Sequence, residues 1–415
     1  MVKLLIVFMI LCPMTFWVGQ DLRGTQEVFY QVFGSMLLCS MLFFNIRPVK
    51  KNKISYGIAV FGVYTMLLFI LGGANRGATV MLNVFLGVLL YFATLQVKKE
   101  DCHLLIKSII VVASINMLYI GLQLLNFDFI FNIRGPENTI LTDAIDPIGF
   151  MGIKAVMGII MSLGAIATLL ISPLLSICFL IPLWISRCTG AVMGLTAGAL
   201  FYFFWIKRKF FWILLPIILL SGALYIVKVD SPMGMMGTRP AMWKMVLKDV
   251  VYGYNLKEPR IQSPFIKNLF TGFGLDAFRN GPIVYFKIAG TDTTIRGIRV
   301  KNNVYDENGK PFTITPGGHL FSPDGKSVDL WAEAHNEFIQ LFYEMGLIGL
   351  AIFGFIVFQL KQRFKYALKS KELVTVTALI LCLMACSLTQ FPFHLSRLGY
   401  LLPILLGLFV TYSED

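Results

Sequence analysis

This chain of 415 residues is strongly apolar, with 57% hydrophobic and only 14% charged residues. Soluble globular proteins carry about 25% charged residues, so the composition excludes a water-soluble enzyme of ordinary type. Lys and Arg number 36 against 23 Asp and Glu, which gives a formal net charge of +13. This excess does not require a nucleic-acid partner, because basic cytoplasmic loops give polytopic membrane proteins the same sign of charge.

Apolar runs long enough to cross a bilayer recur along the chain, so we predict an all-α polytopic membrane protein with about twelve transmembrane helices. The first run lacks a small-x-small cleavage site, and we expect it to be a retained span rather than a signal peptide. The sequence divides into transmembrane helices 1–9 (1–227), an extracytoplasmic loop domain (228–336) and transmembrane helices 10–12 (337–415). The predicted spans are 3–19, 27–46, 54–73, 78–97, 104–125, 155–172, 174–186, 189–206, 210–227, 337–360, 373–390 and 398–412.

The basic residues of the short loops fix the predicted orientation, because such residues are enriched on the cytoplasmic side. With the N-terminus inside, the outer loops hold only scattered cations. The predicted span 174–186 contains Pro182 and the predicted span 398–412 contains Pro403, and a helix bundle tolerates such residues where neighbours satisfy the freed carbonyls. We therefore expect both termini in the cytoplasm. The cations predicted to be inside are Arg47, Lys50, Lys51, Lys53, Lys98, Lys99, Lys107, Lys207, Arg208, Lys209, Lys361, Arg363, Lys365, Lys369 and Lys371.

The loop domain 228–336 is too long to be a turn and changes character along its length. Its first part places Met242, Met245, Val246 and Val250 on one helical face, which predicts a helix at the lipid interface with a tryptophan at headgroup depth. Later, residues 294–300 alternate with a period of two, which is typical of a strand. Two turn signals, Asn308-Gly309 and Pro323-Asp324-Gly325, complete the prediction of a small β-hairpin region.

The seven cysteines lie in or beside apolar segments, and none falls between Lys228 and Asn336. Their spacing suggests neither a disulfide framework nor a zinc site. Cys382 and Cys386 share one helix face, and we expect both thiols to pack against lipid or a neighbouring helix.

The most specific stretch begins at Ala334-His335-Asn336 and continues through Glu344-Met345-Gly346-Leu347-Ile348-Gly349. It lies where the loop domain re-enters the membrane. The start of a helix exposes backbone N–H groups and favours an anion. A histidine there has a pKa near 6.5 and can exchange a proton at neutral pH. A lone interfacial histidine can also be merely solvated, and the surrounding residues weigh against that alternative.

This stretch resembles the signature of the O-antigen ligase and O-antigen polymerase superfamily of membrane glycosyltransferases. Other segments resemble the family's motifs in the expected order: Ser186-Arg187 at the start of a span, Arg239 with Trp243 on one helix, and the Gly-x-Gly run from Asn268 to Phe278. The resemblance covers about residues 150–360. It departs from the family at Gly149–Lys154, where an Asn-rich turn is usual, and at the long segment Tyr254–Asn268.

The resemblance implies a metal-independent, inverting transfer of a glycan, without a cofactor, on the periplasmic face of a bacterial inner membrane. The donor is an undecaprenyl diphosphate-linked oligosaccharide, and the acceptor is a lipid A-core or another glycan. Arginine suits the diphosphate because its planar fork matches phosphate oxygens. His335 would orient or deprotonate the acceptor hydroxyl. The implied catalytic residues are His335, Arg239 and Arg187, and the implied substrate-binding residues are Asn336, Arg279, Arg134, His394 and Trp243.

The sequence is compatible with several alternative functions. A ligase and a polymerase differ only in the acceptor, and we favour the ligase; a protein-glycosylating relative is less favoured. A twelve-helix lipid or oligosaccharide transporter would explain the spans, and it predicts interrupted helices and charges at mid-membrane depth. A structural anchor leaves the ordered motifs unexplained. Membrane lipids are the other expected partner, and nucleic acid is not.

Overall fold

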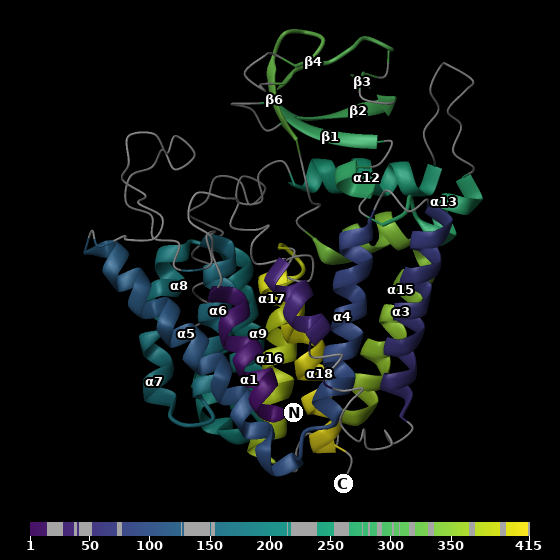
Figure 1. The fold of residues 1–415 in the computed structure, drawn as a ribbon. Helices are drawn as coiled ribbons and strands as arrows, with labels where there is room; N and C mark the ends of the chain where they lie inside the picture. Colours follow the sequence, from purple (N-terminus) through teal and green to yellow (C-terminus); the bar gives the residue numbers. More distant parts are fainter. Residues whose placement is uncertain are drawn as a thin grey trace. The chain divides into compact units, whose positions relative to one another are not determined.

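The protein is described by a computed structural model whose helices and strands are drawn in Figure 1. Within the part of the chain described, five helices are long and apolar enough to cross a bilayer: Lys53–Leu71, Ala78–Leu95, Lys99–Leu124, Thr189–Ile206 and Glu337–Arg363. The described residues are 1–14, 28–36, 40, 52–72, 77–125, 127, 150, 154–213, 215–216, 239–252, 265–275, 277–280, 283–288, 293–300, 303–306, 308–314, 320–330, 336–364, 370–390 and 396–413.

The chain forms two compact units that join segments distant in sequence. Unit 1 comprises Met1–Ser55, Asn83–Ile218 and Phe358–Asp415, and unit 2 comprises Tyr56–Leu82 and Leu219–Val357. The helices are α1 Val2–Leu11, α3 Lys53–Gly72, α4 Ala78–Leu95, α5 Cys102–Leu124, α6 Lys154–Thr168, α7 Pro173–Cys178, α8 Leu180–Ser186, α9 Thr189–Ile206, α12 Arg239–Tyr252, α13 Phe265–Thr271, α14 Ala277–Asn280, α15 Glu337–Arg363, α16 Lys371–Cys386, α17 Ser396–Gly399 and α18 Leu401–Ser413, with 3-10 turns η1 Cys12–Met14 and η2 Lys99–Asp101.

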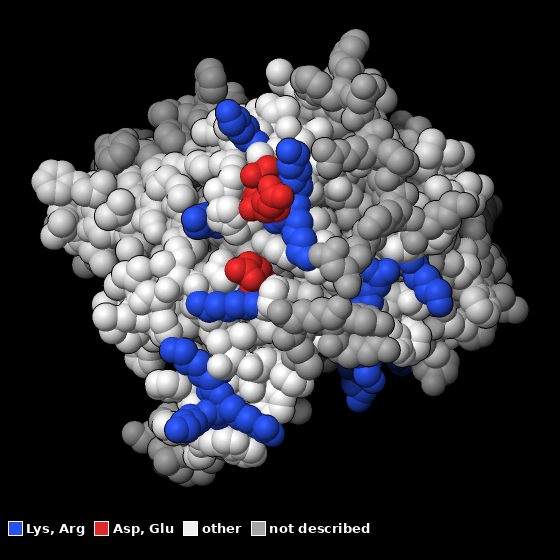
Figure 2. Space-filling model, turned by 90° about the horizontal axis from the view of Figure 1, so that it is seen from below, with Lys and Arg blue, Asp and Glu red and all other residues white. Residues whose placement is uncertain are grey.

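If successive helices of unit 1 cross the membrane in alternating directions, the ends of α6 and α9 and the start of α16 lie on the same side. Two hydrogen bonds join these helix ends. The Tyr202 hydroxyl near the end of α9 donates to the carbonyl of Leu169 after α6, at 2.8 Å. The Lys371 ammonium at the start of α16 donates to the carbonyl of Leu170. In Figure 1, α1 begins and α18 ends on this side of unit 1. Figure 2 views the molecule from that direction and shows Lys and Arg spread widely, with few Asp and Glu.

In unit 1, α9 packs closely against α16 through three glycines at four-residue spacing, Gly190, Gly194 and Gly198. A Cβ added at Gly194 would lie 2.3 Å from the sulfur of Cys386 and 2.8 Å from the carbonyl oxygen of Cys382. Small residues let helix backbones approach closely in membrane bundles. The two thiols are therefore packed against a neighbouring helix, as their shared face predicts, and both residues have 0% exposure.

Two of the predicted spans, 174–186 and 398–412, are interrupted, and a proline explains each interruption. The predicted span 174–186 consists of α7 and α8, separated at Phe179. The ring of Pro182 clashes with the carbonyl of the residue four positions earlier in a continuous helix, which is Cys178, the last residue of α7. The same spacing relates Pro403 to Gly399, the last residue of α17. Neither α8 nor α18 alone reaches the length of about 17–25 residues that a bilayer requires.

A stripe of exposed apolar side chains runs along α7 and α8 in unit 1. Leu174, Ile177, Ile181 and Trp184 are 74%, 54%, 67% and 85% exposed, respectively, at spacings that keep them on one face. Soluble proteins rarely expose contiguous apolar patches of this kind. The stripe and the long apolar helices are the features of a membrane-associated protein.

Unit 2 contains a six-stranded antiparallel sheet of order β3-β2-β1-β6-β5-β4. The region is larger than the small hairpin region predicted from the sequence. The alternating residues form a strand, Thr294–Val300, and both turn signals hold glycines with positive φ, Gly309 at 80° and Gly325 at 74°. The strands are β1 Ile283–Ile288, β2 Thr294–Val300, β3 Asn303–Tyr305, β4 Thr313–Ile314, β5 Leu320–Phe321 and β6 Ser327–Leu330.

Candidate active site

Half of the predicted site residues can be placed with their side chains. His335, Arg134 and His394 lie outside the described residues, and Arg279 belongs to α14 without a described side chain. Arg187 belongs to unit 1, whereas Arg239, Trp243 and Asn336 belong to unit 2. The convergence of Arg187 with the residues of unit 2 therefore stays a prediction.

Arg187 lies in the tight turn between α8 and α9 and is exposed to solvent. Its φ and ψ of 49° and 23° are left-handed, the one positive φ outside glycine in the described part of the chain. Such a conformation costs about 1–3 kcal/mol in a residue with a side chain. The buried Ser186 hydroxyl donates to the carbonyl of Leu183 at 2.6 Å and accepts from the N–H of Cys188 at 3.3 Å. These hydrogen bonds fix the backbone of the turn, and the Arg187 side chain is exposed to solvent.

The helix α12 begins at Arg239, and its apolar face corrects one prediction. Met242, Val246 and Val250 have 0% exposure and belong to a core with residues of α14, β1 and α15. Protein, not lipid, covers the face that the sequence assigned to the membrane interface. Trp243 is half-buried and packs against the same core, and its position at headgroup depth stays a prediction.

Asn336 caps the first turn of α15. Its side-chain oxygen accepts hydrogen bonds from the N–H groups of Phe338 at 3.0 Å and Ile339 at 3.1 Å. An N-cap of this kind stabilises a helix by about 1 kcal/mol. One turn later, the Gln340 amide donates to the buried carboxylate of Glu344 at 3.2 Å. The Glu344 carboxylate is therefore hydrogen-bonded within its own helix.

The helix α15 is interrupted at Gly346, where φ and ψ are 64° and −162°. The Gly-x-Gly run packs against this break. The N–H of Phe273 donates to the carbonyl of Tyr343 at 2.8 Å, and the N–H of Gly274 donates to that of Glu344 at 3.1 Å. The carbonyl of Met345 accepts from the hydroxyl of Tyr64 in α3, at 2.9 Å. Three consecutive carbonyls of the interrupted turn thus have protein donors.

Glycine is required on both sides of this contact. A Cβ on Gly272 would lie 2.4 Å from the carbonyl carbon of Glu344, and one on Gly346 would lie 2.4 Å from the carbonyl group of Phe270. Both φ angles are positive, at 70° and 64°. Two motifs that the sequence carries about seventy residues apart are therefore in direct backbone contact.

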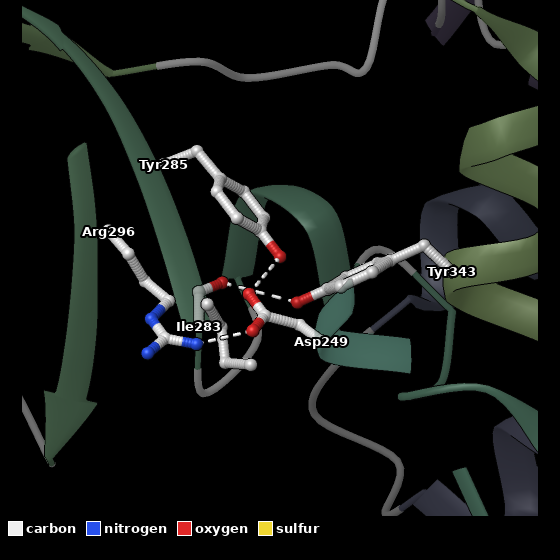
Figure 3. Close-up of polar contacts among 5 residues, drawn as sticks. All are labelled: Asp249, Ile283, Tyr285, Arg296 and Tyr343. Atoms are coloured by element: carbon white, nitrogen blue, oxygen red, sulfur yellow. Dashed lines mark hydrogen bonds and ion pairs between the residues drawn. The ribbon is translucent and has the colours of Figure 1, made fainter. Parts of the chain in front are cut away.

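A buried polar cluster connects α12 to the sheet (Figure 3). The Asp249 carboxylate, 2% exposed, forms an ion pair with Arg296 and accepts a hydrogen bond from the Tyr285 hydroxyl at 2.9 Å. Burial raises the pKa of Tyr285 well above its ordinary value, with Tyr343 and Asp249 adding to the shift. The hydroxyl therefore remains a donor. On the far side of the cluster, the Tyr343 hydroxyl of α15 donates to the carbonyl of Ile283 at 3.4 Å.

The sequence prediction missed this cluster, although one signal was present. Asp249 lies between Val246 and Val250 on the apolar face of α12. A carboxylate on an apolar face must have a buried partner, since an unpaired buried charge is costly. The sequence alone does not identify the partner, because Tyr285 and Arg296 come from strands about forty residues further on.

The structure brings three of the family-like segments onto one core. Trp243 of α12, Phe273 of the Gly-x-Gly run and Ile339 of α15 all pack against the buried cluster that contains Phe278 and Tyr343. No family model matches the sequence, and no curated protein matches it significantly. Among the described residues, no group of three or more His, Cys, Asp or Glu could hold a metal ion.

Proposed function

We propose that the protein is a membrane glycosyltransferase of the O-antigen ligase type. It transfers a glycan from undecaprenyl diphosphate to an acceptor sugar, such as that of a lipid A-core, on the periplasmic face of a bacterial inner membrane. In this proposal, twelve helices cross the membrane and both termini are cytoplasmic. The reaction inverts the anomeric carbon, because the acceptor hydroxyl attacks from the face opposite the departing diphosphate.

The common core of unit 2 is the observation that carries the proposal. Arg239 lies one turn before Trp243, and Asn336 lies one turn before Gln340 on the helix that contributes Ile339. Since Trp243 and Ile339 pack against the same core, the starts of α12 and α15 belong to one packed assembly. Sequence order alone would not bring segments about a hundred residues apart to one place.

The chemistry follows from the residue types at these two helix starts. The Arg239 guanidinium can bind phosphate oxygens in a bidentate manner and keeps its charge at any physiological pH. His335 directly precedes the helix cap Asn336 in the sequence. In the proposal, His335 accepts the proton of the acceptor hydroxyl while Arg239 neutralises the leaving diphosphate.

The interrupted turn of α15 favours this proposal over a transporter. In transporters with discontinuous helices, unwound carbonyls line a cavity and coordinate the transported ion. The carbonyls of Tyr343, Glu344 and Met345 instead accept hydrogen bonds from Phe273, Gly274 and Tyr64. The interruption therefore serves packing within unit 2.

Reconstitution in vesicles with an undecaprenyl diphosphate oligosaccharide tests the proposal. Two acceptors are supplied separately, a lipid A-core and a second repeat unit, and product length distinguishes ligase from polymerase. We expect His335→Ala to lower the rate about 10²–10⁴-fold, the usual contribution of a general base. Arg239→Ala should abolish measurable transfer. Arg239→Lys should retain only part of the wild-type rate, because lysine lacks the planar guanidinium fork of arginine.

Lys244→Ala provides the matched control, because Lys244 is an exposed cation on the same helix. It should leave the transfer rate unchanged, and all variants should reach the membrane in wild-type amounts. Wild-type rates for both His335→Ala and Arg239→Ala would show that the site has been assigned wrongly. Absence of transfer by the wild-type protein with either acceptor would contradict the proposed function itself.

A further inference from the structure

The Asp249 cluster connects the two helices that begin at the proposed site. Tyr285 and Arg296 are directly opposed residues of β1 and β2, so their side chains leave the same face of the sheet. Both contact the Asp249 carboxylate of α12. The ring of Tyr285 also contacts the ring of Tyr343 in α15, with centroids 6.1 Å apart. One carboxylate thus fixes α12 to a sheet that is itself packed on α15.

The stability of the folded protein alone does not explain why a buried ion pair, rather than apolar residues, joins α12 to the sheet. Removing two charges from water costs several kcal/mol per ion, and their attraction offsets this cost only when the geometry is good. Apolar residues of similar volume often give equal or greater stability. Hydrogen bonds and ion pairs are directional, however, whereas the apolar contacts of Met242, Val246 and Val250 leave a helix free to rotate or slide slightly.

Rotation or sliding of α12 would displace Arg239. The helix is continuous from Arg239 to Tyr252, and Asp249 lies about 15 Å from Arg239 along its axis at 1.5 Å per residue. A rigid helix transmits a change at one end to the other. Misplacement of a binding group by about 1 Å can cost a hundredfold in rate.

We propose that Asp249 is a positioning residue. Held by Tyr285 and Arg296, it fixes the orientation of α12 and thereby directs Arg239 toward the diphosphate of the lipid-linked donor. This inference rests on the proposed function, because it assumes that Arg239 binds a diphosphate. It predicts that the contribution of Asp249 to donor binding depends on Arg239.

A double-mutant cycle on the full-length protein in detergent measures this dependence. The probe is undecaprenyl diphosphate without a sugar, and its dissociation constant is measured for the wild type, Asp249→Asn, Arg239→Ala and the double variant. We expect Asp249→Asn to weaken binding about tenfold when Arg239 is present and less than about twofold when it is absent. Equal losses in both backgrounds would overturn the inference, because a purely structural role adds independently of Arg239.

Two further variants, and two outcomes of the binding measurement itself, keep the results distinct. Asp324→Asn, at an exposed turn of the same sheet, should leave binding unchanged. If Asp249→Asn does not fold, Arg296→Gln replaces it, since that variant removes the other side of the ion pair. Failure of the wild-type protein to bind the lipid would contradict the proposed function. Wild-type binding with no effect of Arg239→Ala would overturn the inference about positioning.

Discussion

Glycines make close contacts in both units, but the backbone around them differs. In unit 1, Gly190, Gly194 and Gly198 lie inside the regular helix α9 and face α16. In unit 2, Gly272 and Gly346 have positive φ angles and face each other's backbone. The first contact needs a small side chain, whereas the second needs a small side chain and a backbone conformation that other residues avoid. Substitutions should therefore affect the two units unequally.

Gly346→Ala should have the largest effect. With φ 64° and ψ −162°, this position has a backbone conformation that costs alanine about 1–3 kcal/mol, and the added Cβ would lie 2.4 Å from the backbone of Phe270, which has no flexible end to move. We expect the free energy of unfolding to fall by more than about 3 kcal/mol, measured by thermal unfolding in detergent. Gly354→Ala, in the same helix with no atom within 4 Å of an added Cβ, should change stability by less than about 1 kcal/mol. Similar losses for both variants would show that neither the backbone conformation nor the close contact at Gly346 has a specific effect on stability.

Gly194→Ala should have a smaller effect that a second substitution relieves. Its Cβ would collide chiefly with the Cys386 sulfur, at 2.3 Å, and overpacking of this kind costs about 1–3 kcal/mol. Adding Cys386→Ala should restore part of the lost stability, although the carbonyl of Cys382 remains close. A double variant no more stable than Gly194→Ala would show that the backbone contact dominates here as well.

Tyr64→Phe tests the third donor to the interrupted turn of α15. It removes the hydroxyl that donates to Met345 and leaves a buried carbonyl without that partner, at a cost of about 1 kcal/mol. Tyr56→Phe on the same helix is the control, because that side chain is 55% exposed. Thermal midpoints that shift equally would mean that the Tyr64 hydrogen bond contributes nothing specific.

The smallest effect concerns alkaline pH and the Asp249 cluster. The pKa of Tyr285 is raised by burial, and by Tyr343 and Asp249 against the opposing effect of Arg296. The unfolded chain therefore loses this proton near pH 10 while the folded protein keeps it, so stability falls as the pH rises above 10. Tyr285→Phe should reduce that fall by under about 1 kcal/mol at pH 10.5. The test compares the unfolding of both proteins at pH 8.5 and 10.5, and identical pH slopes would contradict it.

The sequence predicts regular elements of this fold well where local pattern decides. The span 189–206 and the strand 294–300 have the bounds of α9 and β2. The sequence does not reveal the interruption at Gly346, because that glycine lies in an apolar run that would otherwise continue as helix. Only contact with residues 270–274, which the chain reaches through tertiary folding, makes the break favourable.

The candidate site could be predicted only in part, because local sequence pattern does not identify tertiary neighbours. Helical periodicity identifies the apolar face of α12 but does not distinguish lipid from protein as its cover, and protein covers it. Asn336 was predicted to bind substrate, and the structure shows its side chain capping α15. The cap is compatible with a neighbouring His335 at the site, whose role remains a prediction. Asp249 was overlooked because its partners lie on a different element.

The hydrogen bond from Tyr64 to Met345 joins residues 281 positions apart. At the usual rate of about 5–20 residues per second, a ribosome needs roughly 15–60 s to synthesise the intervening chain. Throughout that interval α3 exists without the complete segment Leu219–Val357 of unit 2. Newly made α3 therefore remains accessible to insertion factors and proteases during this interval, and unit 2 can be completed only late in translation.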